Sequence, residues 1–247
     1  MVFLPNLRLI IAYDGTTFAG FQKQKNTGLT IQGILEEKLH KIVKEPVKVI
    51  GAGRTDAGVH ALGQVVNFTS SWKAPVEKIP QILNNSLPPE IRVVCAEEVP
   101  EDFHARYWAK KKQYNYYLYF GPPSPFYERY AWALPKRLSL DRVQKALEYL
   151  IGTHDFTGFS AVGSSAKNPV KTMYKAVYEE EGERGFFTFE ADSFLYKMAR
   201  ILTGTLVEIG LGKGEPERIK EILATNNRNL SGKTAPARGL FLMKVFY

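Results

Sequence analysis

The order of hydrophobic and polar positions over the first hundred residues predicts four strands and two helices. The apolar run "LRLIIAY" (Leu7–Tyr13) is typical of a buried strand. Over residues 31–43 hydrophobic positions recur on one helical face, and Thr30 stands in the N-cap position. Further strands are expected at 47–52, 61–69 and 91–99, with a weaker helix at 76–87 that contains Pro80. This β-α-β-β-α-β order is the ferredoxin-like, or split βαβ, pattern.

The second half of the chain repeats this architecture without a clear sequence repeat. A strand is expected at 113–120, a helix at 139–152 capped by Ser139, and a strand pair at 171–180 and 185–192. Helices at 194–210 and 215–224 and a strand at 239–247 follow. We therefore predict an α+β fold of two ferredoxin-like (βαββαβ) halves, in a mixed, mainly antiparallel sheet with helices on one side. The predicted subdomains are residues 1–105 and 106–247.

The composition of the 247 residues restricts the compartment and the cofactors. The chain is 45% hydrophobic and 23% charged, and its apolar runs are shorter than the roughly 18–20 residues that span a bilayer. The first residues show no basic n-region, so no secretion signal is predicted and a cytoplasmic location is expected. The single Cys95 excludes an internal disulfide and is expected to be a small core residue. Four histidines without ligand spacing predict no metal site.

Positive charge points to a class of partner only where it is clustered. The 33 Lys and Arg against 25 Asp and Glu give a net charge of +8 and a pI near 9.4, which also fits an ordinary basic protein. From Arg106 to Phe120, however, "RYWAKKKQYNYYLYF" holds four basic residues, seven aromatics and no acid. Basic residues interleaved with aromatics are typical of RNA binding, although most of these tyrosines are also expected to pack in a core.

The stretch "GAGRTDAGVHALGQVVNF" (residues 51–68) presents a carboxylate on a glycine-rich turn. Arg54 and Asp56, two apart on extended chain, should point to the same side, and the Arg should favour the ionised carboxylate. A structural ion pair alone would not need the flanking His60 or the three glycines, which are expected to allow positive φ and a tight turn. These glycines are Gly51, Gly53 and Gly58. We interpret the turn as one that aims Asp56 at a substrate.

Two other glycine-rich stretches resemble phosphate loops only in part. "NRNLSGKT" (Asn227–Thr234) ends like a Walker A loop but has Asn227 where the first glycine is required. "GLGKG" (Gly210–Gly214) follows a predicted helix instead of a strand, so it is not a dinucleotide fingerprint. Both are expected to be loops that end helices.

Several motifs together resemble one known family along essentially the whole chain, the bacterial tRNA pseudouridine synthase A family. The "GRTDAGVHA" core is highly specific, and it occurs with "FHAR" and "APARGL". The other matching stretches are "YDGTTFAGFQKQ", "TIQGILE", "LNNSLPPEIRV", "DFTGFSA" and "SFLYKMARILTGTLVEIGLGK".

This resemblance implies an isomerase that converts uridine to pseudouridine at positions 38, 39 and 40 of the tRNA anticodon stem-loop. It makes Asp56 the catalytic residue, lets Tyr114 stack on the target uracil, pairs Arg200 with Asp56, and uses Arg54 to hold the nucleotide flipped out. It also implies a homodimer, with tRNA lying across both subunits in an RNA-binding cleft between the halves, and no metal or cofactor.

The chemistry of the turn agrees with this resemblance. The reaction breaks an N-glycosidic bond and rejoins uracil through C5, without oxidation or hydrolysis. A carboxylate can meet the positive character at C1′, or it can remove a proton from the sugar, and both routes stay open. Two other hypotheses are a non-catalytic RNA-binding protein and a small-nucleotide enzyme. The charge of Asp56 disfavours the latter, because it would repel phosphate.

The chain departs from the family pattern at three positions. Phe21 stands where Trp is usual, and Lys197 and Ala199 stand where His and Val are usual. Phe21 keeps an aromatic plug, whereas Lys197 adds charge near the helix that supplies Arg200. Lys197 is therefore expected to bear on RNA contact or specificity and to leave the chemistry unchanged.

Overall fold

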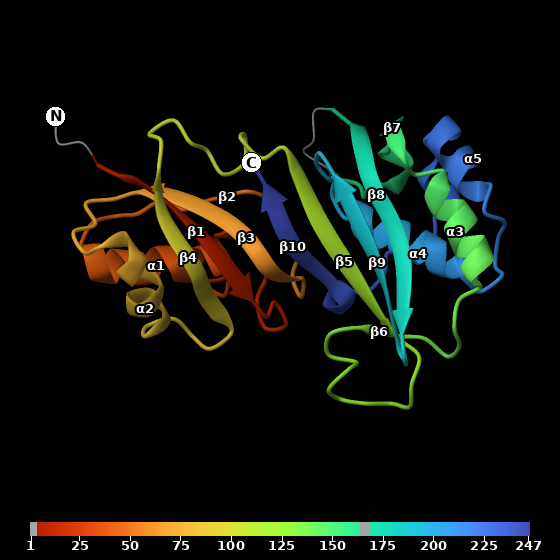
Figure 1. The fold of residues 1–247 in the computed structure, drawn as a ribbon, viewed down its shortest axis with the longest axis horizontal. Coiled ribbons are helices and arrows are strands. Elements are labelled where there is room, and N and C mark those ends of the chain that lie inside the picture. The colour runs from red at the N-terminus through yellow and green to blue at the C-terminus, as the bar shows by residue number, and fades with distance from the viewer. Residues whose placement is uncertain (1–3, 164–167) are drawn as a thin grey trace. The chain divides into compact units, whose positions relative to one another are not determined.

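The computed structural model describes residues 4–163 and 168–247, which divide into two compact units (Figure 1). Unit 1 is Met1–Lys110 with Leu242–Tyr247, and unit 2 is Lys111–Phe241. The end of the chain joins unit 1 through hydrogen bonds from Lys110 N–H to the Phe246 carbonyl (2.8 Å) and from the Tyr247 hydroxyl to the Ala105 carbonyl (2.7 Å). These units are not identical to the predicted subdomains 1–105 and 106–247, which remain a prediction.

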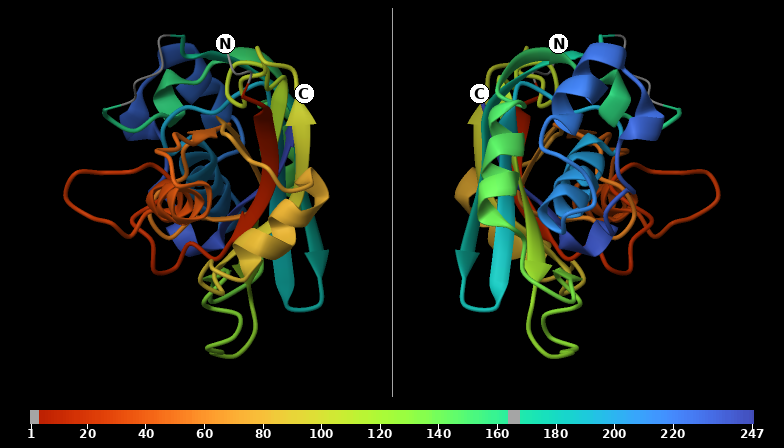
Figure 2. Two further views of the ribbon diagram at one scale, coloured as in Figure 1. Left: turned by 90° about the vertical axis from the view of Figure 1, so that its left-hand side faces the viewer. Right: turned by 90° about the vertical axis from the view of Figure 1, so that its right-hand side faces the viewer.

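Unit 1 has the element order expected from its sequence. Strands β1 (Asn6–Tyr13), β3 (His60–Thr69) and β4 (Ile91–Val99) pair in the order β4-β1-β3, with the short β2 (Ile50–Gly51) on β3 and all pairs antiparallel. Strand β10 (Leu240–Phe246) is the next neighbour of β3. The helices are α1 (Ile31–Val43) and α2 (Ile79–Asn84), the latter preceded by the 3-10 turn η1 (Val76–Lys78). In both views of Figure 2 the red segment between β1 and α1 projects away from these strands.

The helices of unit 1 begin where local chemistry allows. The Thr30 hydroxyl accepts the Gly33 N–H (3.2 Å) at the start of α1, which confirms the predicted cap. Helix α2 begins only at Ile79, so Pro80 lies in the first turn, where its missing N–H is not needed. At the other end, the Asn84 amide bonds both the N–H and the carbonyl of Val93 on β4 (2.8 and 2.9 Å). This contact covers part of an edge strand.

Cys95 is exposed, so the prediction that it is a core residue was wrong. The register of β1 on β4 pairs Ile10 with Cys95 and Ile11 with Val93, which leaves Val94 as an extra residue. Such a bulge interrupts the alternation of side chains between the two faces of a strand. Val94 and Cys95 are therefore both exposed on β4.

Unit 2 is built on an antiparallel path of four strands in the order β5-β9-β8-β7. Their bounds are β5 (Lys111–Tyr119), β7 (Gly152–Asp155), β8 (Val170–Glu181) and β9 (Arg184–Ala191), and β6 (Trp132–Ala133) pairs with β5 in parallel. The helices are α3 (Leu140–Glu148), α4 (Met198–Gly210) and α5 (Arg218–Thr225). The 3-10 turns are η2 (Thr157–Phe159), η3 (Arg228–Leu230) and η4 (Ala237–Gly239). With its helices and mixed, mostly antiparallel strands, the chain is an α+β protein.

Three details of unit 2 differ from the sequence prediction. Strands β6 and β7 are too short to give a hydropathy pattern. Helix α4 begins at Met198 instead of residue 194, because Lys197 takes a left-handed backbone (φ 59°) that no helix can continue through. Ser139 does stand at the N-cap of α3, but its side chain makes no capping hydrogen bond.

Helix α4 is the centre of the core of unit 2. Eleven of its thirteen residues are buried, and the exceptions are Arg200 and Glu208. Nearby strands contribute fully buried rings from Tyr116, Phe187 and Phe189. A polar group buried beside so apolar a helix lowers stability unless it is hydrogen-bonded. No helix among residues 4–163 and 168–247 is both long and apolar enough to cross a membrane.

Candidate functional site

The turn that carries Asp56 is anchored by a buried residue beside it, Thr55. The Thr55 hydroxyl lies 2.8 Å from the Tyr13 hydroxyl, and the Gln64 amide donates to the Gly53 carbonyl at 2.8 Å and to the Tyr13 hydroxyl at 3.5 Å. Burial raises the pKa of Tyr13 to about 12, although the hydrogen bonds to Thr55 and Gln64 oppose the rise. Neutral side chains thus attach the turn to β1 and β3. The attachment to β1 is made by Thr55, the residue next to Asp56.

The glycines of the turn have different roles. Of the three, only Gly58 has a positive φ (75°), next to the hydrogen bond from Val59 N–H to the Asp56 carbonyl (3.1 Å). The expectation of a positive φ at Gly51 and Gly53 was therefore wrong. Gly51 is small because the ring of Phe21 occupies the place of a β carbon. A fourth glycine, Gly20 (φ 96°), faces the turn, and a β carbon there would lie 2.7 Å from the Thr55 carbonyl oxygen.

Exposure alternates along the three residues of the "RTD" motif. Arg54 is exposed, Thr55 is buried and Asp56 is half-buried. This alternation of exposure is compatible with the predicted common side of Arg54 and Asp56, which remains a prediction. The Arg54 guanidinium also lies 3.4 Å from the Gln22 side-chain oxygen, in the segment that leads to α1.

His60 supports the fold beside the turn. Its ring is 1% exposed, and its Nδ1 lies 3.0 Å from the Gly15 N–H and 3.2 Å from an Asp14 carboxylate oxygen. These contacts hold the end of β1 against the start of β3. The sequence pattern, which grouped His60 with the carboxylate, did not distinguish this role.

Tyr114 and Tyr116 lie on β5 in unit 2. The Tyr114 ring is 7% exposed and meets the ring of Phe194 edge-on, with centroids 4.9 Å apart. Tyr116 is fully buried, and its hydroxyl donates to the Pro236 carbonyl at 2.8 Å. Burial raises the pKa of Tyr116, while the charges of Arg200 and Arg238 oppose the rise. Tyr116 is therefore a structural support for the "TAPARGL" segment (residues 234–240).

Arg200 is fixed to that same segment. Its Nε donates to the Ala235 carbonyl at 2.8 Å, and the Ala235 N–H donates to the Arg200 carbonyl at 3.1 Å. A guanidinium held through Nε keeps a defined direction for its two terminal nitrogens. The matching stretches "FLYKMAR" and "TAPARGL" thus meet in space within unit 2.

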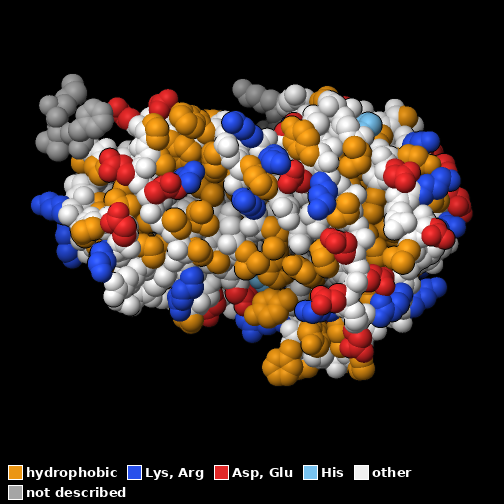
Figure 3. All heavy atoms as spheres, in the orientation of Figure 1, with side chains coloured by type: hydrophobic (Ala, Val, Ile, Leu, Met, Phe, Trp, Pro, Cys, Tyr) orange, Lys and Arg blue, Asp and Glu red, His pale blue; other side chains and the backbone are white. Residues whose placement is uncertain are grey.

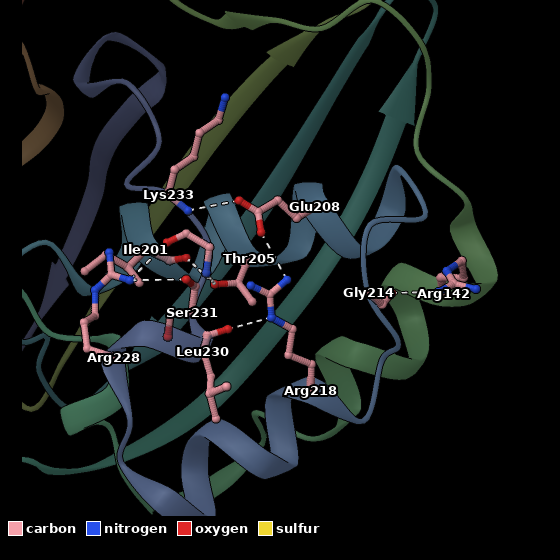
Figure 4. A network of polar contacts seen from close by, with 11 residues as sticks. Arg142, Ile201, Thr205, Glu208, Gly214, Arg218, Arg228, Leu230, Ser231 and Lys233 are labelled. Carbon is pink, nitrogen blue, oxygen red and sulfur yellow. Dashed lines mark hydrogen bonds and ion pairs between the residues drawn. The ribbon is translucent and has the colours of Figure 1, made fainter.

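We define the clamp loop as residues 231–235, which run along α4 (Figure 4). The Gly232 N–H donates to the Thr205 hydroxyl (2.9 Å), and the Lys233 N–H donates to Glu208 (3.1 Å). Gly204 is small because a β carbon there would overlap the Lys233 carbonyl oxygen. The loop therefore approaches the helix backbone as closely as atoms allow.

Charged residues complete the attachment of the clamp loop. Glu208 also binds the Arg218 guanidinium (3.1 Å), whose Nε donates to the Leu230 carbonyl at 2.6 Å. Arg228 donates to the Ser231 and Gly232 carbonyls (3.4 and 3.1 Å). This network, visible in Figure 4, gives the Glu208 carboxylate its partners at the edge of a largely apolar helix.

The three departures from the family pattern have local structural descriptions. The Phe21 ring packs against Gly51, and its N–H donates to the Thr55 carbonyl at 3.1 Å, so it supports the turn. Lys197 is the left-handed N-cap of α4, with its ammonium 4.9 Å from the centre of the Tyr196 ring. Ala199 is buried in the helix.

The predicted site residues fall into two groups, Arg54 with Asp56 in unit 1 and Tyr114 with Arg200 in unit 2. Within each unit the structure adds supports that sequence reasoning missed, namely Tyr13, Thr55 and Gln64 for the turn and Glu208 for the clamp loop. A signal for Gln64 was present, because it is a polar residue within the apolar run of β3.

The distribution of charged side chains on the surface and the grouping of metal-ligating side chains also bear on the site. On the face drawn in Figure 3, Lys and Arg are interspersed with acids and do not form one continuous basic area. In the part of the chain that the structure describes, no three His, Cys, Asp or Glu side chains form a group able to hold a metal ion.

Comparisons with known proteins agree with these motifs. A family model described as tRNA pseudouridine synthase matches residues 9–108 and 146–247. The chain is 44% identical to tRNA pseudouridine synthase A of Exiguobacterium sp. over 244 residues, covering 99% of this chain and 98% of the relative. It is 43% identical to the same enzyme of Thermoanaerobacter sp. (strain X514) over 245 residues, covering 99% and 100%.

Among solved structures, one of a Cbf5-Nop10-Gar1 complex aligns with 96% of this chain and 48% of the matched chain. The TM-score is 0.38 and the identity 13%, so the assignment rests on sequence. With the "RTD" turn built as described and the relatives matched end to end, the chain belongs to the tRNA pseudouridine synthase family of isomerases, among the tRNA pseudouridine synthase A enzymes.

Proposed function

We propose that this chain isomerises uridine to pseudouridine at positions 38, 39 and 40 of the tRNA anticodon stem-loop, with Asp56 as the catalytic carboxylate. The observation that carries the proposal is the turn itself. Asp56 follows a buried Thr55, which is tied to Tyr13 on β1 (2.8 Å). A carboxylate on a rigid turn keeps its direction without a further loss of entropy when substrate binds.

The reaction sets the demands on these residues. The bond from C1′ to N1 breaks, the uracil turns, and C5 bonds to the same C1′, while C5 loses a proton and N1 gains one. Asp56 acts either as nucleophile at C1′ or as the base that removes a sugar proton. Neither route requires an oxidant or a hydrolytic water, and no cofactor is part of the proposal.

The remaining roles follow the two groups of residues. Flipping a stacked uridine costs roughly a few kcal/mol, and stacking on Tyr114, worth about 1–3 kcal/mol by analogy with other RNA binders, would offset it. Arg54 would hold the flipped nucleotide. Arg200, directed by the Ala235 carbonyl, would pair with Asp56. This requires the halves, each ferredoxin-like, to face a shared RNA-binding cleft.

Two properties of the assembly belong to the same proposal. A homodimer would let one tRNA lie across both subunits, and the net charge of +8 would attract its phosphates. The expected location is the cytoplasm, where tRNA is modified.

The test is conversion of unmodified tRNA with no additive, followed by mapping of the isomerised uridines. Wild-type protein should modify positions 38–40. Asp56→Asn should lower turnover about 10³-fold or more while tRNA affinity stays within a few-fold. Glu77→Gln, which removes an exposed carboxylate elsewhere in unit 1, is the matched control and should behave as wild type.

Two outcomes would contradict the proposal. Turnover retained by Asp56→Asn in a clean preparation would remove the carboxylate from its role. Tight tRNA binding by the wild type with no change in uridine content would favour the non-catalytic RNA-binding protein instead.

A further inference from the structure

An aromatic side chain that the proposed reaction does not use is exposed in the segment between β4 and β5. We call residues 103–110 of unit 1 the platform segment. Its start is fixed by asparagines at one end of β1 and β3. The Phe103 carbonyl accepts from the Asn6 and Asn67 amides (2.9 and 3.3 Å), and the Ala105 N–H donates to the Asn67 side-chain oxygen at 2.9 Å. The segment is therefore anchored to the sheet of unit 1.

Within this segment Tyr107 is held rigidly although it is 75% exposed. The His104 ring stacks on it with centroids 4.2 Å apart and planes 30° from parallel. His104 is itself fixed, because its Nδ1 lies 3.2 and 3.3 Å from the N–H groups of Arg106 and Tyr107, and its carbonyl accepts from Trp108 N–H at 3.0 Å. A large aromatic surface thus stands in solvent with little entropy left to lose on binding.

The charged residues around Tyr107 indicate which kind of partner would bind its exposed ring. The Arg106 guanidinium carbon lies 5.8 Å from the ring centre, and the exposed Lys110 is the other cation of the segment. The platform segment contains no acid; Glu101 and Asp102 precede it. An aromatic face beside two cations and no acid matches a nucleobase and its phosphate.

The platform segment lies far from Asp56 within unit 1. Strand β3 begins at His60, beside the turn, and reaches Asn67 seven residues later, where the platform segment is tied. At about 3.3 Å per residue the two ends are roughly 23 Å apart. A base on Tyr107 is therefore not the uridine that reacts.

We propose that Tyr107 and Arg106 form a second RNA contact, which stacks an unpaired base of the substrate tRNA and neutralises its phosphate at a distance from the reacting uridine. The inference rests on the proposed function, because that function supplies the RNA. It assigns to the platform segment a role in affinity and none in chemistry.

The experiment compares Tyr107→Ala, Tyr107→Phe and a control, Tyr174→Ala, which removes an equally large ring that is 52% exposed on β8 of unit 2. Kd for unmodified tRNA is measured at two salt concentrations, with kcat and KM for isomerisation. Loss of one stacked base should raise Kd and KM of Tyr107→Ala about 5- to 50-fold with kcat unchanged. Tyr107→Phe, which keeps the ring, and Tyr174→Ala should stay within two-fold of wild type.

The contribution of Arg106 is tested through the salt dependence of Kd. Arg106→Ala should weaken binding less than Tyr107→Ala and reduce the slope of log Kd against log salt by about one. An unchanged slope would remove Arg106 from the phosphate contact.

Several outcomes would overturn the inference. These are a wild-type Kd for Tyr107→Ala, an equal loss in Tyr107→Phe, which would point to the hydroxyl, or a change of oligomeric state on sedimentation with RNA affinity intact, which would make this surface a protein interface. A failure of the proposed function can be told apart from a failure of this inference. If wild-type protein binds tRNA but isomerises no uridine, the proposed function is wrong, and the Kd of Tyr107→Ala still shows whether the platform segment contacts RNA.

Discussion

The turn around Asp56 and the clamp loop beside Arg200 are both rigid, but they are held by different forces. Neutral groups fix the turn, through the Tyr13–Thr55 hydroxyl pair and the close approach of Gly20. The clamp loop is fixed by backbone contact with α4 and by the charges of Glu208 and Arg218.

This difference suggests a division of work between the two regions. Neutral supports hold the carboxylate without adding charge beside it, which leaves Arg200 as its proposed charged partner. A guanidinium that only needs direction can be held by a network that contains other charges. Both regions should respond to added volume, because a β carbon at Gly20 or at Gly204 would meet a backbone carbonyl. The turn should in addition respond to alkaline pH, and the clamp loop to charge removal and salt.

The largest expected effect comes from volume at the clamp loop. In Gly204→Ala the new β carbon would overlap the Lys233 carbonyl oxygen, so helix or loop must shift. We expect a loss of about 3 kcal/mol in the free energy of unfolding, measured with urea, and a larger fall in kcat than rise in KM. Gly28→Ala, where no atom lies within 4 Å, is the control. Equal stability of the two variants would show that the clamp loop yields freely.

A smaller effect is expected at the turn in alkali. The pKa of Tyr13 is about 12 in the folded chain and near 10 when unfolded, so its stabilising contribution is complete below pH 10 and is lost as pH rises towards 12. Between pH 9.5 and 12 wild type should lose about 2 kcal/mol more unfolding free energy than Tyr13→Phe. The other tyrosines are common to both proteins. Parallel pH profiles would mean that the Tyr13 phenol ionises as readily in the folded state.

The smallest expected effect is a difference between the two regions in how salt changes the cost of a substitution in unfolding free energy. Glu208→Gln removes the partner of Arg218, whose side chain is 22% exposed, and should cost about 1 kcal/mol at low salt and less at 1 M salt. Thr55→Val should cost a similar amount at either salt concentration, because it removes a neutral hydrogen bond. Glu217→Gln, in an exposed pair with Lys145, should change little. The comparison fails if the Thr55 and Glu208 variants respond alike to salt.

Sequence reasoning succeeded where one local pattern decides the structure. The helix over residues 31–43 and its Thr30 cap follow from periodicity and a single side-chain oxygen, and the structure has both. The order of elements in unit 1 was predictable for the same reason. The family was recognisable because the motif around Asp56 is highly specific.

It failed where long-range contacts decide. Cys95 is exposed because a bulge at Val94, in the pairing of its own strand with β1, interrupts the alternation of faces. Gly51 is small because of the Phe21 ring, thirty positions away in sequence. Helix α4 was predicted four residues too early, because nothing local announces the left-handed Lys197. The roles of Asp56, Tyr114, Arg54 and Arg200 remain predictions, of which the Asp56→Asn variant tests the first directly.

The return of Leu242–Tyr247 to unit 1 has a consequence for synthesis of the chain. The Tyr247 ring lies 5.5 Å from the guanidinium of Arg8 on β1. This contact of the first strand can form only after all of unit 2 has been synthesised. On the ribosome, β1, β3 and β4 emerge long before β10 can join them. Premature termination anywhere in unit 2 should therefore leave the N-terminal unit short of a strand, with an open edge on β3 that favours aggregation or degradation.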